Sequence, residues 1–187
     1  MLVGSGFCAA FQMVTLTPMI LGWAYVLIAL VALQRLAELV YARRNTLALL
    51  ARGAKETGAS HYPLFVLLHG GWLVTLFVLT EPNPAPRWLW LGLFFVCQGF
   101  RVWILASLGP YWTTRIITLD GAPAVRSGLY RYLRHPNYLI VGLELPALPL
   151  GLGMPLTALV FGVLNVVLLA YRISVEDGAR KALSRAR

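Results

Sequence analysis

The longest apolar stretch of this chain is residues 138–171, YLIVGLELPALPLGLGMPLTALVFGVLNVVLLAY, in which Glu144 is the single charged residue. A membrane-spanning helix needs roughly 20 predominantly apolar residues, so the stretch is long enough for two helices that are each rather short for a full crossing. Its middle reads GLGMP, residues 151–155, and glycine and proline close together mark a turn. The pattern therefore predicts a helical hairpin with one arm on each side of these residues.

Three further apolar stretches precede the hairpin, at residues 17–41, 63–80 and 88–108. The chain of 187 residues is 59% hydrophobic and 12% charged, whereas soluble domains carry about 25% charged residues. No Lys or Arg precedes the first stretch, so we interpret it as a retained span and not as a removed signal peptide. We predict an all-α integral membrane bundle of about five transmembrane helices. It forms a single domain over residues 1–187, with the first three spans within residues 17–108.

The charge of the chain is strongly basic, because 16 Lys and Arg against seven Asp and Glu give a formal net charge of +9. Binding of nucleic acid needs a basic polar surface, which this composition lacks, so we expect no nucleic acid partner. The basic residues gather at residues 43–61 and 109–137 and in the C-terminal tail, while the connection at 81–87 holds only Arg87. The positive-inside rule therefore predicts a multi-pass protein of the cell (inner) membrane, with its N-terminus outside and its C-terminus cytoplasmic.

Polar residues are concentrated in one segment, residues 109–138, which reads GPYWTTRIITLDGAPAVRSGLYRYLRHPNY. It is too polar to cross a membrane and too aromatic for a solvated linker, so we expect irregular structure that folds back against the cytoplasmic helix ends. Beyond the hairpin, Arg172 and Glu176 are four residues apart and share a helix face. Taken alone, the polar segment is explained as the basic start of a helix, and Arg172 with Glu176 as an i,i+4 ion pair. A helical hairpin, however, would place His135 to Tyr138 opposite Arg172 to Glu176, so that the two groups of residues would form a cleft.

One pattern of residues closely resembles the isoprenylcysteine carboxyl methyltransferase family: Val125-x-x-Gly128-x-Tyr130-x-x-x-Arg134-His135-Pro136-x-Tyr138, a hydrophobic hairpin, then Arg172-Ile173-x-x-Glu176-Asp177. These are multi-span enzymes that methylate lipid-bearing substrates with S-adenosylmethionine. The resemblance implies that residues 109–187 form a methyltransferase-like catalytic region of a bacterial-type member. It also implies this cofactor, a lipophilic or prenylated substrate and contact with membrane lipids.

The resemblance further implies roles for individual residues. Arg172 would meet the acidic group of the acceptor, and His135 would act both in catalysis and in cofactor binding. The chain departs from the family in carrying Glu176-Asp177 where Glu-Glu is usual, and in lacking the longer aromatic tail of many members. The implied cofactor contacts are Ala122, Pro123, Ala124, Val125, Tyr130, His135, Pro136, Asn137, Tyr138 and Glu176.

Glu144 lies within the first arm of the hairpin, and an ionisable residue inside a membrane span indicates function by default. Two interpretations are open: a buried carboxyl group that is hydrogen-bonded to a neighbouring helix, or a catalytic base. A carboxylate acceptor is already ionised at neutral pH, whereas a phenol or an enol is helped by a base. With the departures above, Glu144 leads to the hypothesis that the acceptor is a hydroxyl on a lipid-tailed ring, such as an alkylated pyrone or resorcinol.

Four other ionisable residues lie in the predicted spans. Arg35 and Glu38 are three apart and are expected to form an ion pair that faces the bundle. Arg101 is expected to snorkel from the inner end of its span. His69, beside Gly70 and Gly71, is expected to form an interhelical hydrogen bond, or alternatively to contact the substrate.

Two rival functions fit parts of the same pattern. A membrane reductase of the steroid-reductase type has a similar C-terminal half and uses a nicotinamide cofactor, NADPH. A non-enzymatic lipid-binding protein would share the composition. The sequence has no glycine-rich nucleotide fingerprint and no His/Cys/Asp cluster with metal-ligand spacing, so we expect neither a Rossmann-type site nor a metal.

Overall fold

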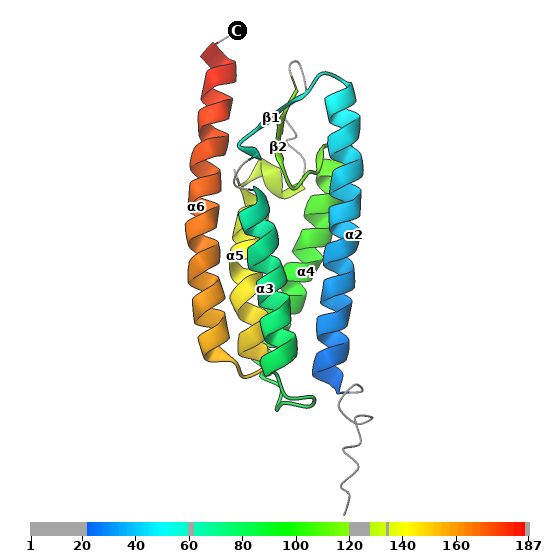
Figure 1. Ribbon diagram of the computed structural model, residues 1–187, viewed down its shortest axis with the longest axis vertical. Helices are drawn as coiled ribbons and strands as arrows, with labels where there is room; N and C mark the ends of the chain where they lie inside the picture. Colours follow the sequence, from blue (N-terminus) through cyan, green and yellow to red (C-terminus); the bar gives the residue numbers. More distant parts are fainter. Residues whose placement is uncertain (1–21, 60–61, 120–127, 134, 186–187) are drawn as a thin grey trace, which may run out of the picture.

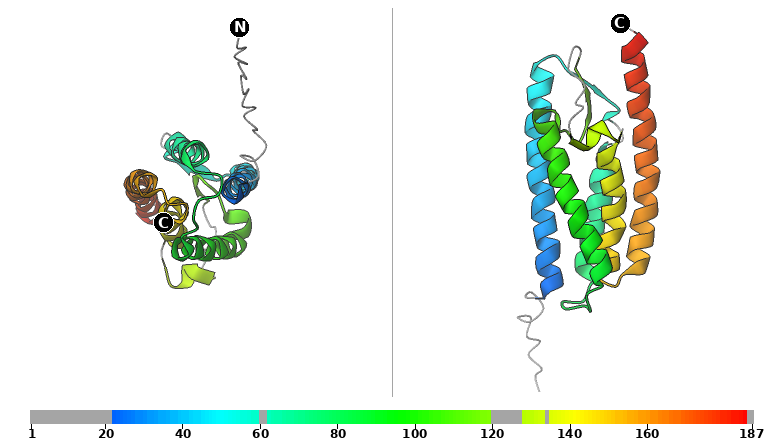
Figure 2. Two further views of the ribbon diagram at one scale, coloured as in Figure 1. Left: turned by 90° about the horizontal axis from the view of Figure 1, so that it is seen from below. Right: turned by 180° about the vertical axis from the view of Figure 1, so that it is seen from behind.

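The computed structural model describes residues 22–59, 62–119, 128–133 and 135–185, with side chains described as far as Gly178. Figure 1 shows a bundle of helices that run along the long dimension of the molecule, which confirms the all-α membrane bundle. Seen end-on in Figure 2, α5 lies between α4 and α6. The described helices are α2 (Trp23–Ala51), α3 (Tyr62–Leu79), α4 (Trp88–Leu108), α5 (Pro136–Gly151) and α6 (Pro155–Arg185).

Four of these helices, α2, α3, α4 and α6, are long and apolar enough to cross a membrane. The fifth, α5, has 16 residues and holds Pro146 and Pro149 within it. At 1.5 Å per residue it is about 24 Å long, which is less than the roughly 30 Å of a hydrocarbon core. Most of its buried residues face its neighbours α4 and α6. The part of the chain that the structure describes therefore contains four helices long enough to span the membrane and one shorter helix packed among them.

The predicted hairpin turn is confirmed, because α5 ends at Gly151 and α6 begins at Pro155. Gly153 in this turn has φ +81°, a conformation that L side chains rarely adopt. The prediction of a connection from residue 43 onward was wrong in its first part, since α2 continues to Ala51. No glycine or proline interrupts residues 23–52. Gly53, which has φ +85°, then ends the helix, because a glycine just after a helix readily adopts the left-handed conformation.

A small antiparallel ribbon joins β1 (Lys55–Thr57) to β2 (Ile116–Thr118). Its strands lie where the sequence predicted connections and irregular structure, so the expectation was wrong on this local point. Arg115 binds both carboxylate oxygens of Glu56 at 2.9 and 3.0 Å, and Asn45 donates to the carbonyl oxygen of Trp112 at 2.9 Å. We call this end of the bundle the ribbon end. It also holds the start of α5, the end of α6 and the short helices η2 (Gly109–Tyr111) and η3 (Gly128–Arg131).

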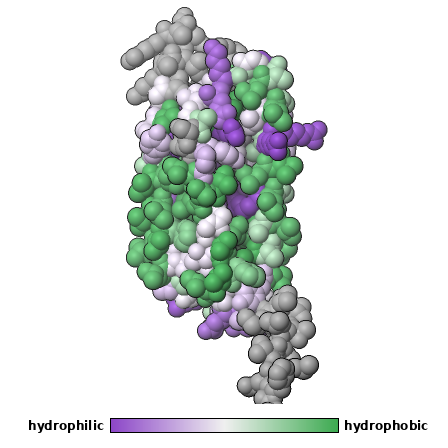
Figure 3. All heavy atoms as spheres, in the orientation of Figure 1, coloured by the Kyte–Doolittle hydropathy of each residue, from purple (hydrophilic) through white to green (hydrophobic). Residues whose placement is uncertain are grey.

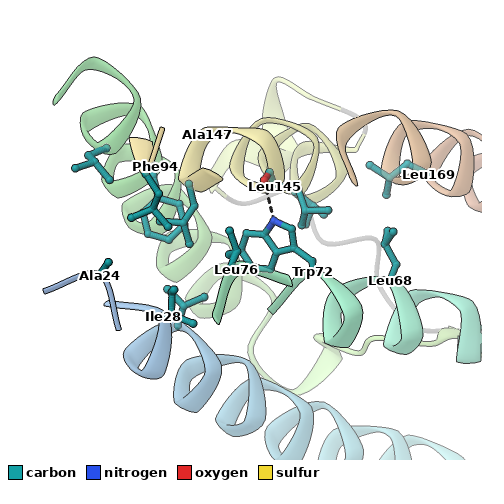
Figure 4. Packing of buried hydrophobic residues seen from close by; sticks show 14 residues of the cluster. Ala24, Ile28, Leu68, Trp72, Leu76, Phe94, Leu145, Ala147 and Leu169 are labelled. Atoms are coloured by element: carbon teal, nitrogen blue, oxygen red, sulfur yellow. Dashed lines mark hydrogen bonds between the residues drawn. The ribbon is translucent and has the colours of Figure 1, made fainter. Parts of the chain in front are cut away.

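The larger of two apolar clusters lies among the helices on the side away from the ribbon end, and a smaller one, with Ile104 and Trp112, lies toward it. Trp72 of α3 is fully buried, and its indole N–H donates to the carbonyl oxygen of Leu145 in α5 at 3.2 Å, as Figure 4 shows. The outer surface is also apolar: Figure 3 shows a hydrophobic band between two more hydrophilic ends. Exposed leucine and valine side chains on α2, α3, α4 and α6 make up much of this surface. Such a band is what a membrane-embedded bundle presents to lipid.

Candidate functional site at the ribbon end

The hairpin brings the two predicted halves of the site into direct contact. Tyr138 lies in the first turn of α5, where Pro136 opens the helix without losing a hydrogen bond. The Tyr138 hydroxyl donates to the Glu176 carboxylate at 2.5 Å and accepts from Arg172 Nε at 3.0 Å. The start of α5 and the end of α6 therefore lie side by side as expected, with Tyr138 as their central contact.

Aromatic rings surround this contact. The His135 ring stacks on Tyr138 with centroids 5.3 Å apart and an interplanar angle of 13°, and His135 Nε2 lies 3.8 Å from Asp177 Oδ1. The Arg172 guanidinium carbon lies 5.3 Å from the Phe65 ring centroid and 5.6 Å from that of Tyr138. Both are within the range of a cation–π interaction. The site therefore combines a carboxylate with several aromatic faces.

Tyr130 of η3 adds a phenol to the same region. Burial, with a smaller contribution from the negative charge of Glu176, raises the pKa of Tyr130 to about 12. Both effects disfavour the phenolate. Tyr130 therefore stays neutral at physiological pH and can donate a hydrogen bond.

A cavity of about 390 Å³ extends from this site into the bundle. Its upper part, at the ribbon end, is lined by polar and aromatic side chains that include Asn137, Tyr138 and Arg172. Its walls include Leu36 of α2 and Val66 of α3, which are both exposed on the outer surface. Figure 3 shows hydrophilic atoms in a gap within the hydrophobic band. The cavity therefore reaches the apolar outside between α2 and α3.

Glu144 lies deeper, in a buried polar cluster that joins three helices. Its side chain is 0% exposed and forms an ion pair with Arg35 of α2. From α4, Gln98 donates to Glu144 Oε1 at 2.6 Å, and Arg101 Nε lies 3.3 Å from Glu144 Oε2. Of the two interpretations of Glu144, the structure shows the hydrogen-bonded buried carboxyl group, and Glu144 does not line the cavity.

Glu38 completes the buried cluster and balances its charge. Arg35 Nη1 lies 3.0 Å from Glu38 Oε2, which confirms the predicted ion pair. Arg101 Nε lies 3.4 Å from Glu38 Oε1, and Gln34 donates to that oxygen at 3.0 Å. The prediction that Arg101 snorkels was wrong, because it is 4% exposed and two buried carboxylates offer it closer partners than water. Two cations and two anions thus share one site, which is how proteins accommodate buried charge.

Sequence reasoning gave α2 and α3 little part in the site: it offered substrate contact only as the alternative for His69 and did not single out Phe65. The cavity is lined by Phe65 and His69 of α3 and by Arg35 of α2, far from the motif that carried the resemblance. The interhelical hydrogen bond expected of His69 is not found among the described residues; its Nδ1 lies 2.9 Å from the carbonyl oxygen of Phe65 in the same helix. An ionisable residue in each of these spans was the available signal.

The residues at the ribbon end fit S-adenosylmethionine. Its sulfonium is a cation, which aromatic faces and a nearby carboxylate stabilise. Asn137 lines the cavity, and its Oδ1 is buried without a hydrogen-bond partner among the described residues, as expected of an atom that binds a ligand. Four of the implied cofactor contacts, Ala122, Pro123, Ala124 and Val125, lie outside the described residues, as does Arg134 of the motif.

Comparisons with known proteins place this site in a family. The chain is 38% identical over 164 residues to an uncharacterized protein of Bacillus subtilis, YpbQ, and the match covers 86% of this chain and 98% of that protein. It is 27% identical to an uncharacterized protein of Haemophilus influenzae, over 75% of this chain and 84% of that protein. No solved structure matches the chain. Residues 90–181 match the isoprenylcysteine carboxyl methyltransferase family model. They include the described cluster of Tyr138, Arg172 and Glu176, and the chain belongs to this family of membrane methyltransferases.

Proposed function

We propose that this chain is an S-adenosylmethionine-dependent enzyme that O-methylates a lipid-tailed acceptor at the cytoplasmic face of the membrane. One observation carries the proposal: the cluster of Tyr138, Arg172 and Glu176 stands at one end of a cavity whose apolar walls reach the outer surface between α2 and α3. A polar head group and a long alkyl tail would both be accommodated there. The tail gains nothing by leaving the membrane before it binds.

Residues of α5, α6 and η3 would hold the cofactor. Asn137, Tyr138 and Glu176 supply polar contacts, while Tyr130 and His135 supply aromatic faces. When bound, the cofactor supplies a methyl group on a positively charged sulfur. Fixing the relative orientation of two reactants lowers the barrier substantially. The chain's task is therefore to hold the acceptor oxygen in line and to exclude water.

Arg172 is the proposed contact for the acceptor. Its guanidinium lines the cavity and is already oriented by the Tyr138 hydroxyl and the Phe65 ring. An oxygen that carries negative charge would bind there through a charge-assisted hydrogen bond. Such an oxygen belongs either to a prenylcysteine-type carboxylate or to an ionised hydroxyl of an alkylated pyrone or phenol. We favour the hydroxyl, as in an alkylpyrone or alkylresorcinol O-methyltransferase-like branch of the family.

The partners and location follow the same reasoning. We propose an inner-membrane protein that contacts membrane lipids and a lipophilic small molecule, with no nucleic acid partner. The basic ribbon end, with Arg52, Lys55 and Arg115, would face the cytoplasm. The acceptor would enter sideways from the bilayer.

Ligand-induced thermal stabilisation of the purified protein in detergent tests the cofactor. A ligand that binds only the folded protein raises its apparent stability by mass action. We expect S-adenosylhomocysteine to raise the Tm and NADPH to leave it unchanged, with the S-adenosylhomocysteine effect lost in Glu176→Gln. Stabilisation by NADPH alone would indicate the reductase, and stabilisation by neither would indicate a lipid-binding protein.

The acceptor class is tested with radiolabelled cofactor. Purified protein is assayed with a prenylated N-acetylcysteine and with a long-chain alkylresorcinol, and we expect label in the resorcinol product. Methylation of the prenylcysteine alone would overturn the hydroxyl proposal but not the methyltransferase proposal.

A further inference from the structure

The deep part of the cavity is lined by three charged side chains, Arg35 and Glu38 of α2 and Arg101 of α4, which we call the deep wall. We propose that the deep wall binds a second oxygen of the acceptor. The preferred acceptor is then a ring with two oxygens meta to each other and a lipid tail meta to both. This inference rests on the proposed O-methylation of a hydroxyl, with the reacting oxygen at Arg172.

The deep wall places charge where a lipid ligand would lie. Arg35, Glu38 and Arg101 are only 8%, 9% and 4% exposed, and all three line the cavity. Contact with hydrocarbon in place of a polar partner is costly for such groups. A ligand that brings an oxygen to this depth is therefore favoured over one that brings only an alkyl chain.

Arg35 has a donor that is open to such an oxygen. Its two terminal nitrogens are held by carboxylates, Nη1 by Glu38 at 3.0 Å and Nη2 by Glu144. Its Nε is buried and has no hydrogen-bond partner among the residues that the structure describes, which is rare for a buried polar atom. A carbonyl, ether or hydroxyl oxygen would satisfy this N–H through a charge-assisted hydrogen bond.

The distance between the two binding levels suits one ring. Tyr138, which bonds to Arg172, and Glu144, which pairs with Arg35, are six residues apart in α5. At 1.5 Å per residue the two levels are about 9 Å apart along the helix. A ring with two meta oxygens and a hydrogen bond of about 2.9 Å to each spans roughly 10 Å from donor to donor. One head group can therefore reach from Arg172 to Arg35.

The opening of the cavity supplies a third direction, for the tail. Leu36 directly follows Arg35 in α2, and Val66 directly follows Phe65, whose ring lies 5.3 Å from the guanidinium carbon of Arg172. Leu36 and Val66 line the cavity and are 59% and 44% exposed on the apolar outside. The tail would leave sideways between the two oxygen sites. Three mutually meta substituents on a six-membered ring point in three such directions.

This arrangement narrows the class of acceptor. An alkylresorcinol and an alkylated hydroxypyrone both carry two ring oxygens and a tail that are mutually meta. A phenol with one oxygen would leave Arg35 Nε unpaired, and the ortho oxygens of a catechol are too close together to reach both levels. A site built to hydrogen-bond an oxygen rejects an analogue that lacks it, because the buried polar group is left without a partner.

Three probes with equal tails test the proposal on the wild type, without cofactor or turnover. Each carries a pentadecyl chain: a resorcinol with the chain meta to both hydroxyls, a phenol with the chain meta to its hydroxyl, and a catechol isomer of the resorcinol. Isothermal titration calorimetry in detergent measures the Kd of each with cofactor-free protein. We expect the Kd of the resorcinol to be at least about tenfold lower than that of the phenol or the catechol.

Arg35→Lys removes the open donor and keeps the charge. Lysine has a methylene group where arginine has Nε, while its ammonium group can still pair with Glu38 and Glu144. The resorcinol and the phenol should then bind with similar affinity. A second variant, Arg35→Met with Glu144→Met, replaces the ion pair as a unit and leaves Arg101 with Glu38, a change that proteins often tolerate. It should lose the preference as well.

The matched control is Arg87→Lys, the same chemical change at an exposed position between α3 and α4. It should keep the wild-type ratio of the three Kd values. Because ratios are compared, the different partitioning of the probes into micelles cancels between wild type and variants. A cooperative thermal transition verifies that each variant is folded, and the wild-type comparison holds even where a substitution prevents folding.

The outcomes separate this proposal from the proposed function. Equal affinity of the wild type for the three probes overturns the second-oxygen site, and stabilisation by S-adenosylhomocysteine would then leave the methyltransferase standing. A preference for the resorcinol that persists in both Arg35 variants also overturns the proposal, because the second oxygen then has another partner. If the preference depends on Arg35 but S-adenosylhomocysteine does not bind, the second-oxygen site stands and the methyltransferase function fails.

Discussion

Substitution of Glu144 by Gln would leave two buried guanidinium groups, Arg35 and Arg101, with Glu38 as their one remaining carboxylate among the described residues. Removal of one partner from a buried ion cluster typically costs about 3–5 kcal/mol, because a charge then remains buried without compensation. We expect Glu144→Gln to lower the free energy of unfolding by about 3 kcal/mol or more. Unfolding in mixed micelles with increasing denaturing detergent measures this change.

The control for this prediction removes one cation as well. In the double variant Glu144→Gln, Arg101→Gln the net charge of the cluster returns to zero, so part of the lost stability should return. Glu81→Gln, at an exposed position outside the cluster, should have no measurable effect. Equal stability of Glu144→Gln and wild type would contradict the assignment of an ionised Glu144.

The hydroxyl of Tyr138 links the proposed cofactor and acceptor sides of the site, because it bonds to both Glu176 and Arg172. Hydrogen bonds to charged groups contribute about 1.5–3 kcal/mol. Tyr138→Phe should therefore weaken binding of S-adenosylhomocysteine by about tenfold or more, as isothermal titration calorimetry would measure. Tyr132→Phe removes a hydroxyl from a residue that is 76% exposed and should leave the Kd unchanged. An unchanged Kd in Tyr138→Phe would show that this contact does not organise the site.

At the scale of elements, the packing of α5 against α4 depends on a close approach at Gly151. A Cβ at this position would lie 2.5 Å from Leu91 Cδ2 and 3.3 Å from the Leu91 backbone nitrogen. Overpacking of this kind typically costs about 1–3 kcal/mol. We expect Gly151→Ala to lower the Tm, and Leu91→Ala in the same chain to recover part of the loss by making room. A Tm of Gly151→Ala at or above that of the wild type would show that α4 and α5 can separate freely here.

The elements differ in how far the sequence predicts them, and the reason is the range of the interactions involved. The turn at 151–155 and the helix over 88–108 were predicted because glycine, proline and hydropathy act locally. The ribbon was not, since three-residue strands at 55–57 and 116–118 pair across a distance that no local pattern encodes.

Part of the site could likewise be predicted from the sequence and part could not. The spacing of His135, Tyr138, Arg172 and Glu176 follows the hairpin and could be predicted, and the structure brings these residues together. The partners of Glu144 come from α2 and α4, and one sequence gives no means to pair ionisable residues across three helices. The sequence predicted that Glu144 lies within a membrane span, but it did not predict which residues contact it.

The whole molecule separates its polar groups into three levels. Basic residues lie at the ribbon end, the balanced cluster around Glu144 lies within the bundle, and an apolar band surrounds the bundle between its two more hydrophilic ends. The connection at 81–87, between α3 and α4, lies at the opposite end and holds one basic residue. This asymmetry is the physical basis for the proposed orientation, because positively charged segments are retained on the cytoplasmic side.

Cysteine labelling in intact cells measures that orientation. Cys8→Ser and Cys97→Ala give a background without thiols, into which Ala85→Cys or Ala59→Cys is introduced; both alanines are exposed, and neither change alters charge. Ala85 lies in the connection between α3 and α4, whereas Ala59 follows β1 at the ribbon end. A membrane-impermeant maleimide should label Ala85→Cys in intact cells and Ala59→Cys only after lysis. The reverse pattern would place the ribbon end outside, where a cytoplasmic methyl donor could not reach Tyr138 and Glu176.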